Sequence, residues 1–123
     1  LLESDLLTVM KATTDGTLAD TEVKFADKHA CCVILASNGY PTSYKKGFEM
    51  SFTDEALAAT FIAGAKYENG KLVTSGGRVT GTTAIADSLA EAIKEAYRLS
   101  DGVKFEGAYR RTDIGQRALQ ALN

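Results

Sequence analysis

The chain has 123 residues, of which 45% are hydrophobic and 24% charged, values typical of one globular domain rather than a disordered or fibrous chain. Its 14 Lys and Arg residues against 16 Asp and Glu give a net charge of −2, which argues against a nucleic-acid partner bound through its phosphates. No apolar run approaches the roughly 20 residues of a membrane span, so we expect no membrane partner. The two cysteines are adjacent and cannot form a disulfide framework, which predicts a cytoplasmic protein.

The chain begins at Leu1, without an initiator Met and without the pattern of a signal peptide. We therefore expect it to be a piece of a longer protein. Apolar residues at three- and four-residue steps from Leu2 to Met10 predict an amphipathic helix that ends near Thr13. The Asp-Gly pair at 15–16 is its stop signal.

Residues 30–36 form a continuous apolar run that predicts a buried strand, and the Asn-Gly-Tyr-Pro sequence at 38–41 ends it in a turn. Cys31 and Cys32 lie within this run, and we interpret both as core residues; His29 would lie at its edge. Farther along, Thr53 is the expected N-cap of a short helical turn that reaches Ala59.

Residues 61–85 predict a three-stranded antiparallel meander with tight turns at Asn-Gly 69–70 and Gly-Gly 76–77. With two-residue loops, Lys66 pairs with Val73 and Ser75 pairs with Arg78. Alternation of side chains then places a mostly apolar set on one face. That set is Phe61, Ala63, Ala65, Tyr67, Leu72, Thr74, Val79, Gly81, Thr83 and Ile85.

Ser88 and Glu91 form a capping box at the start of an amphipathic helix that reaches about Leu99 and ends at an Asp-Gly pair. A short strand is expected at 103–105 and a C-terminal helix over 113–122. Together these elements predict an α+β fold, an antiparallel sheet with flanking helices.

Lys66 and Arg78 are the candidate anion-binding residues. On the predicted register they share a face of the sheet, on the order of 10 Å apart across the strands and about 7 Å along them. Gly76 and Gly77 would leave backbone N–H groups open to an anion. From spacing alone we favour the alternative that both basic side chains are simply solvated on an exposed face.

Arg111 and Asp113 are a second charged group, which we interpret as a buried ion pair that pins the C-terminal helix rather than as a ligand contact. A single histidine and the absence of a nucleophile-elbow motif leave a catalytic triad unsupported. Adjacent cysteines in a strand point to opposite faces, and one histidine leaves any His/Cys metal site short of ligands, so no metal site is expected. No catalytic residue is therefore assigned, and the residues alone define a basic spot without a reaction.

Four motifs occur in an order and at spacings that resemble the C-terminal part of the phosphoribosylamine–glycine ligase (glycinamide ribonucleotide synthetase) family, within the ATP-grasp superfamily. They are Gly39-Tyr40-Pro41-x-x-Tyr44-x-x-Gly47, Ala63-Gly64-x-Lys66, Glu68-Asn69-Gly70-Lys71-Leu72-Val73-Thr74-Ser75-Gly76-Gly77-Arg78-Val79 and Arg111-x-Asp113-Ile114-Gly115-x-Arg117-Ala118.

This resemblance implies a full-length enzyme of purine biosynthesis that joins phosphoribosylamine to glycine and uses ATP with Mg²⁺ or Mn²⁺. It implies a barrel-sandwich-like C-terminal domain over 17–123, preceded at 1–16 by the tail helix of the ATP-grasp module. Those upstream domains would be its partners, and the fragment alone would be inactive and bind no cofactor.

The resemblance also implies that Lys66 and Arg78 hold the phosphate of the ribonucleotide substrate. The family motif His-Ala-Gly-Thr-Lys is altered, because Ile62 and Ala65 replace its His and Thr. The alternative from another class is a non-catalytic module that only packs on a partner or binds a phosphorylated metabolite.

Overall fold

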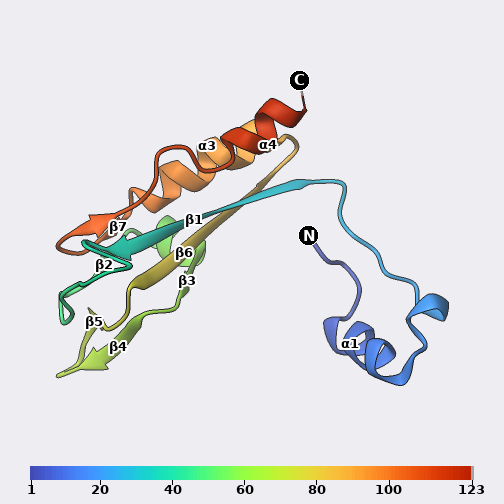
Figure 1. Ribbon diagram of the computed structural model, residues 1–123, viewed down its shortest axis with the longest axis horizontal. Helices are drawn as coiled ribbons and strands as arrows, with labels where there is room; N and C mark the ends of the chain where they lie inside the picture. Colours follow the sequence, from blue (N-terminus) through green and yellow to red (C-terminus); the bar gives the residue numbers. More distant parts are fainter. Residues whose placement is uncertain (123) are drawn as a thin grey trace.

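The structure is a computed structural model that describes residues 1–122; Asn123, the last residue of the expected C-terminal domain, lies outside the described residues. Helices are interspersed among antiparallel strands along the chain, as Figure 1 shows, and the predicted α+β class is confirmed. In chain order the elements are α1 (Leu6–Asp15), the 3₁₀ turn η1 (Leu18–Asp20), β1 (His29–Ser37), β2 (Ser51–Phe52), α2 (Asp54–Ala58), β3 (Thr60–Ile62), β4 (Ala65–Glu68), β5 (Lys71–Thr74), β6 (Arg78–Ala86), α3 (Leu89–Ser100), β7 (Val103–Lys104), β8 (Ala108–Tyr109) and α4 (Gln116–Ala121).

The N-terminal segment lies to one side of the body formed by the other elements (Figure 1). The predicted helix is present as α1, but it begins at Leu6 because Asp5 caps it by accepting a hydrogen bond from the Thr8 N–H at 2.7 Å. Leu2 instead pairs with Phe25 in an isolated β-bridge. Gly16, in the left-handed region at φ 73°, ends the helix as predicted.

The main sheet has four antiparallel strands in the order β3-β6-β1-β8, and α3 packs against one of its faces (Figure 1). Along β1, Cys31, Val33 and Leu35 are buried, whereas Cys32 and Ile34 are exposed on the opposite face. The predicted strand and the buried Cys31 are thus confirmed. The interpretation of Cys32 as a core residue is wrong, because the face of the sheet that carries it is open.

The first core cluster fills the space between the main sheet and α3. Small and branched side chains from both layers meet there, which lets the helix approach the strands closely. The Ser88 hydroxyl accepts from the Glu91 N–H at 3.2 Å and donates to the Glu91 carboxylate at 2.9 Å, so the predicted cap of α3 is present. The buried members of the cluster are Cys31, Val33, Ala84, Ala92, Ile93 and Ala96.

A second core cluster lies where two small sheets, β2–β7 and β4–β5, meet the end of the main sheet. The segment before β2 runs beside β5, because the Thr74 N–H donates to the Phe48 carbonyl and the Met50 N–H to the Leu72 carbonyl, both at 2.9 Å. The buried members are Leu35, Met50, Ala56, Val79, Val103 and Phe105.

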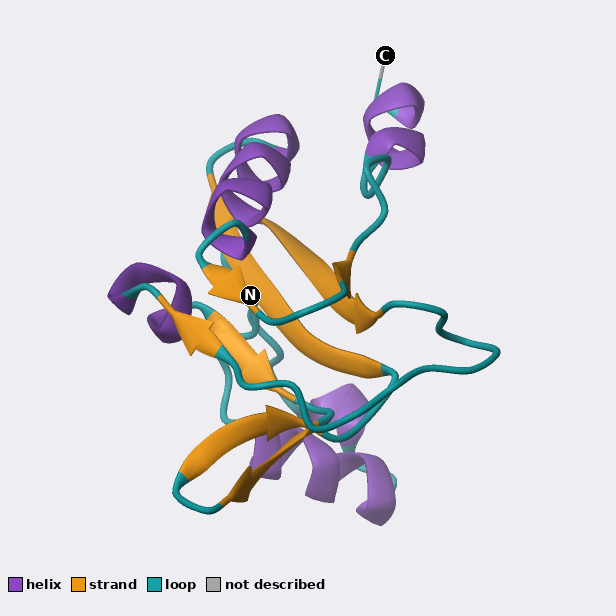
Figure 2. Ribbon diagram, turned by 90° about the vertical axis from the view of Figure 1, so that its left-hand side faces the viewer, coloured by secondary structure: helices purple, strands orange, loops and turns teal. Residues whose placement is uncertain are grey.

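The predicted meander is only half correct. The β4–β5 hairpin has the predicted pairing of Lys66 with Val73, and Asn69 and Gly70 form its turn with positive φ angles of 52° and 79°. The next strand, β6, does not continue this sheet, and both Figures 1 and 2 show the hairpin projecting away from the main sheet. The predicted pairing of Ser75 with Arg78, and the shared face that follows from it, are therefore wrong.

Gly64 explains this break in the meander. Its carbonyl accepts hydrogen bonds from the N–H groups of Ser75 at 2.7 Å and Gly76 at 3.0 Å, and its own N–H donates to the Val79 carbonyl at 3.0 Å. The backbone at 63–64 therefore occupies the edge that β5 would need in order to pair with β6. The Gly-Gly sequence provides room for a backbone crossing rather than a hairpin turn.

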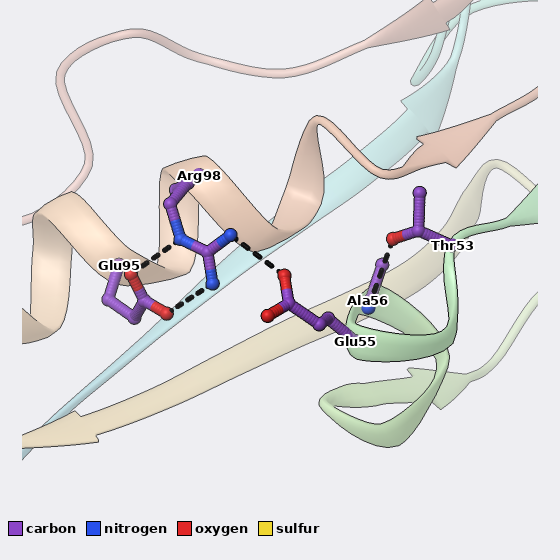
Figure 3. Close-up of polar contacts among 5 residues, drawn as sticks. All are labelled: Thr53, Glu55, Ala56, Glu95 and Arg98. Carbon is purple, nitrogen blue, oxygen red and sulfur yellow. Dashed lines mark hydrogen bonds and ion pairs between the residues drawn. The ribbon is translucent and has the colours of Figure 1, made fainter.

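The predicted helical turn after Thr53 is α2, and Figure 3 shows how it is tied to α3. The Thr53 hydroxyl accepts from the Ala56 N–H at 3.3 Å, which confirms the N-cap. Arg98 on α3 binds Glu55 of α2 at 2.9 Å and Glu95 of its own helix at 2.7 Å. These carboxylates raise the pKa of the Arg98 guanidinium above its ordinary value.

The C-terminal segment is held by a different arginine from the one expected. Arg111 and Asp113 do form a two-bond ion pair at 2.7 and 2.6 Å, but their side chains are 71% and 56% exposed, so the expected burial is wrong. Arg110 is the anchored residue: it stacks on the Tyr97 ring and binds Ser100 and Asp101. None of the helices within residues 1–122 has the length and apolar character needed to cross a membrane.

Candidate anion-binding site

Arg78 is the first residue of β6, at the point where the Gly-Gly loop enters the main sheet. Its backbone pairs with Ala36 beside an irregularity in the β1–β6 register. The side chain is exposed, and within residues 1–122 it forms no ion pair and no hydrogen bond. Of the predicted site residues, Arg78 is therefore the cation that is free to bind a ligand.

Two adjoining hollows lie on the open face of the main sheet, and Cys32, Ile34, Tyr40 and Arg78 line both of them. We call the one that extends over β3 the sheet hollow and the one that extends to the C-terminal segment the C-terminal hollow. The sheet hollow, of about 550 Å³, is further lined by Phe61, Ala63, Gly64, Gly77, Thr80 and Gly81. The C-terminal hollow, of about 540 Å³, is further lined by Ala36, Pro41, Tyr109, Arg110, Arg111 and Ile114.

Tyr40 packs directly on the Gly-Gly loop. A Cβ atom added at Gly77 would lie 2.2 Å from Tyr40 Cδ2 and 3.1 Å from Tyr44 Cε1, so only glycine fits beneath these rings. The loop is tied to the end of β1 because the Ser37 N–H donates to the Gly77 carbonyl at 2.8 Å and the Ser37 hydroxyl to the Gly76 carbonyl at 2.9 Å. Arg78 thus projects from a firmly held backbone.

Lys66 lies on the β4–β5 hairpin, in a different sheet from Arg78. Its ammonium group is 3.0 Å from Glu68 Oε1 in an exposed ion pair, and it lines neither hollow. The register that was to place it on one face with Arg78 is not formed. A joint role of Lys66 and Arg78 in phosphate binding stays a prediction that rests on the family resemblance.

The predicted backbone donors are also partly engaged. The Gly76 N–H already donates to the Gly64 carbonyl at 3.0 Å, so a ligand would have to compete for it. Binding of an anion through both Gly76 and Gly77 likewise stays a prediction, and the guanidinium of Arg78 is the more accessible donor.

The two hollows are suited to binding rather than to proton transfer. Within residues 1–122 no Asp, Glu or His lines either of them, so they offer no carboxylate or imidazole for proton transfer. Within residues 1–122 there is no group of three His, Cys, Asp or Glu side chains that could hold a metal ion. Burial raises the pKa of the Cys31 thiol, on the other face of the sheet, which keeps that thiol in its protonated form.

Sequence reasoning identified Arg78 but did not find the surface around it. The hollows combine residues of β1, the turn after it, β3, β6 and the C-terminal segment, and the sequence separates Cys32 from Ile114 by 82 positions. The available signal is the Gly-Tyr-Pro sequence at 39–41, which predicts a turn and belongs to one of the four family motifs but was not assigned to a binding surface. An exposed aromatic side chain in such a turn is a frequent binding residue.

Comparison with known proteins assigns the chain to a domain family. Residues 30–117 match the family described as phosphoribosylglycinamide synthetase, C domain. The chain is 48% identical to the bifunctional purine biosynthetic protein PUR2,5 of Pichia angusta over 98% of its own length. It is 47% identical to the phosphoribosylamine–glycine ligase of Caldanaerobacter subterraneus subsp. tengcongensis over 93% of its length.

A solved structure agrees with the sequence relatives. The crystal structure of the phosphoribosylamine–glycine ligase from Thermotoga maritima superposes with a TM-score of 0.65 and 42% identity, and the match covers 69% of this chain and 21% of that one. The chain spans 16% of the Pichia angusta protein and 28% of the Caldanaerobacter ligase. It is thus similar to a small part of each relative.

Proposed function

Because the chain belongs to the phosphoribosylglycinamide synthetase C-domain family, we propose that it is the C-terminal part of an ATP-dependent phosphoribosylamine–glycine ligase. The complete enzyme joins phosphoribosylamine and glycine to give glycinamide ribonucleotide, ADP and phosphate, a step of purine biosynthesis in the cytoplasm. The chain spans only 28% of the bacterial ligases that it resembles, so it contributes to this reaction without catalysing it alone.

ATP and its Mg²⁺ or Mn²⁺ belong to the upstream part of the polypeptide. The support for this placement is the family membership together with the small share of each ligase that this chain spans. When bound, the metal would neutralise charge on the phosphoryl group that ATP transfers.

The contribution of this chain is to position the ribonucleotide substrate. Arg78, with Lys66, Gly76 and Gly77 as the further candidates, binds the substrate phosphate. The observation that carries this proposal is the unpaired, exposed Arg78 between two hollows on the open face of the main sheet. A guanidinium group suits this task because its planar donors match phosphate oxygens, and holding the phosphate fixes the reacting amine in place.

The second contribution is packing on the catalytic module. Phe61 is 71% and Ile85 58% exposed on the open face, and Leu7 and Met10 of α1 are 66% and 58% exposed. Large apolar side chains exposed on more than one element of a small domain are the residues that contact with another domain would cover. The upstream domains of the same polypeptide are the proposed partner, and nucleic acid and membranes are not.

The test uses the full-length protein that contains this chain. Arg78→Ala should raise the KM for phosphoribosylamine about tenfold or more, because a hydrogen bond to a charged group is lost, while the KM values for ATP and glycine stay within about twofold. Lys94→Ala, on the exposed side of α3, is the control for loss of a surface cation. If the KM of each of the three substrates is the same in Arg78→Ala as in the control, the phosphate role of Arg78 is refuted.

A further inference from the structure

The C-terminal hollow brings a second exposed guanidinium, that of Arg111, to the same surface as Arg78. Arg78 enters it from β6 of the main sheet, and Arg110 and Arg111 enter it from the segment that follows β8. We propose that Arg111 binds the substrate phosphate together with Arg78 in this hollow. This proposal rests on the proposed ligase function and adds a binding residue to it. Arg111 then has a role in the site rather than the purely structural role expected from the sequence.

The neighbouring arginines at 110 and 111 have different surroundings. Arg110 is only 24% exposed; its guanidinium lies 5.1 Å from the centre of the Tyr97 ring and donates to the Asp101 carboxylate at 2.6 Å. It also binds the Ser100 hydroxyl, so its donors are used inside the fold. The side chain of Arg111 is 71% exposed, and its one partner within residues 1–122 is the nearby Asp113. Arg111 is therefore the arginine that can reach a ligand.

The position of Arg111 is fixed before any ligand binds. The Tyr97 hydroxyl donates to the Arg111 carbonyl at 2.7 Å and accepts from the Ile114 N–H at 3.0 Å, which clamps this segment to α3. Asp113 holds the guanidinium through Nε and Nη2. A guanidinium has five N–H donors, so three remain for phosphate oxygens.

The walls of the C-terminal hollow indicate the class of ligand. Ile34, Tyr40, Tyr109 and Ile114 supply apolar surface beside the two cations. A volume of about 540 Å³ lies within the range of small-molecule sites, and apolar walls with a few placed charges are their usual composition. This combination fits a phosphate monoester on a sugar, with the phosphate between Arg78 and Arg111 and the sugar on the apolar wall.

The experiment compares two variants of the full-length protein that break the same ion pair. Arg111→Ala should raise the KM for phosphoribosylamine about tenfold or more and weaken inhibition by ribose 5-phosphate by the same factor, with the KM values for ATP and glycine within about twofold. Asp113→Asn should leave that KM unchanged or lower it, because it removes a negative charge beside the phosphate. Arg111→Lys, which keeps the charge, should recover part of the affinity.

The results separate this proposal from the proposed function. If Arg78→Ala raises the KM while Arg111→Ala behaves like Lys94→Ala, the role of Arg111 is refuted and the phosphate site at Arg78 stands. If Arg111→Ala and Asp113→Asn raise the KM equally, the ion pair is only structural and the proposal is refuted again. If neither arginine variant changes any KM, the phosphate site itself is refuted. Thermal unfolding of each variant establishes that its fold is intact.

Discussion

Gly64 offers the sharpest test of how the chain crosses the start of β6. Its φ angle is not in the left-handed region, so its backbone conformation is open to any residue. A Cβ atom added there would lie 2.4 Å from the Arg78 carbonyl oxygen and 2.9 Å from Gly76 Cα. Both contacts are with backbone atoms, which cannot rotate away as the end of a side chain can.

The cost of Gly64→Ala follows from these distances. To reach an ordinary contact with the Arg78 oxygen, the backbone has to separate by about 1 Å, and overpacking of this kind costs typically about 1–3 kcal/mol. The same shift stretches the hydrogen bonds that join Gly64 to Ser75, Gly76 and Val79, each worth about 0.5–1.5 kcal/mol. We expect the free energy of unfolding to fall by about 2 kcal/mol or more, and the melting temperature by roughly 8 °C or more.

The measurement is urea and thermal unfolding of the chain followed by circular dichroism. Ala63→Ser, at the exposed neighbouring position, is the matched control and should stay within about 0.5 kcal/mol of the parent chain. A Gly64→Ala variant as stable as this control would show that the backbone at 63–64 does not approach β6 as closely as described. The explanation for the broken meander would then fail with it.

Three further predictions concern the core, the N-terminal helix and the cysteines. Leu35→Ala should lower the free energy of unfolding by about 2–5 kcal/mol in urea denaturation, because Leu35 is 4% exposed in the second core cluster. Hydrogen bonds from the Thr8 hydroxyl and N–H lower the pKa of Asp5 below its ordinary 3.8. The stabilisation of α1 by the Asp5 carboxylate is therefore complete above pH 3.8 and is lost as the pH falls through the lower folded-state pKa. An NMR titration of the Asp5 carboxyl with a midpoint at or above 3.8 would contradict this prediction. Iodoacetamide should modify Cys32 and not Cys31 in the folded chain, because Cys31 is buried and its thiol has a raised pKa. Peptide mass spectrometry after labelling measures this, and modification of Cys31 without modification of Cys32 would contradict the prediction.

Features set by neighbouring residues could be predicted from the sequence. The Asn69-Gly70 turn requires two positive φ angles, and these residues accept them at low cost whatever surrounds the hairpin. The Ser88 hydroxyl likewise satisfies the Glu91 N–H within one helical turn, although the Glu91 carboxylate accepts from the Ser88 hydroxyl and not from the Ser88 N–H of the predicted capping box. In both cases the chemistry that decides the structure lies within four residues, so the pattern is sufficient. The two-residue strands β2 and β8 carry too little pattern to be recognised.

Features set by distant contacts could not be predicted. The Gly76-Gly77 sequence has the composition of a hairpin turn, but these glycines are needed because Gly64 and Tyr40 approach them from elsewhere in the chain. Cys32 was misplaced for a related reason. A continuous apolar run predicts a strand covered on both faces, whereas here α3 covers one face and the other is open.

Ile62 and Ala65, the positions at which the sequence departs from the motif it resembles, lie outside the candidate site. Ile62 is on β3, 42% exposed and paired with Thr80, and Ala65 begins β4, where it packs against the second core cluster. Neither residue lines the sheet hollow or the C-terminal hollow. The phosphate site proposed at Arg78 and Arg111 therefore contains neither residue, and its test does not depend on these two departures.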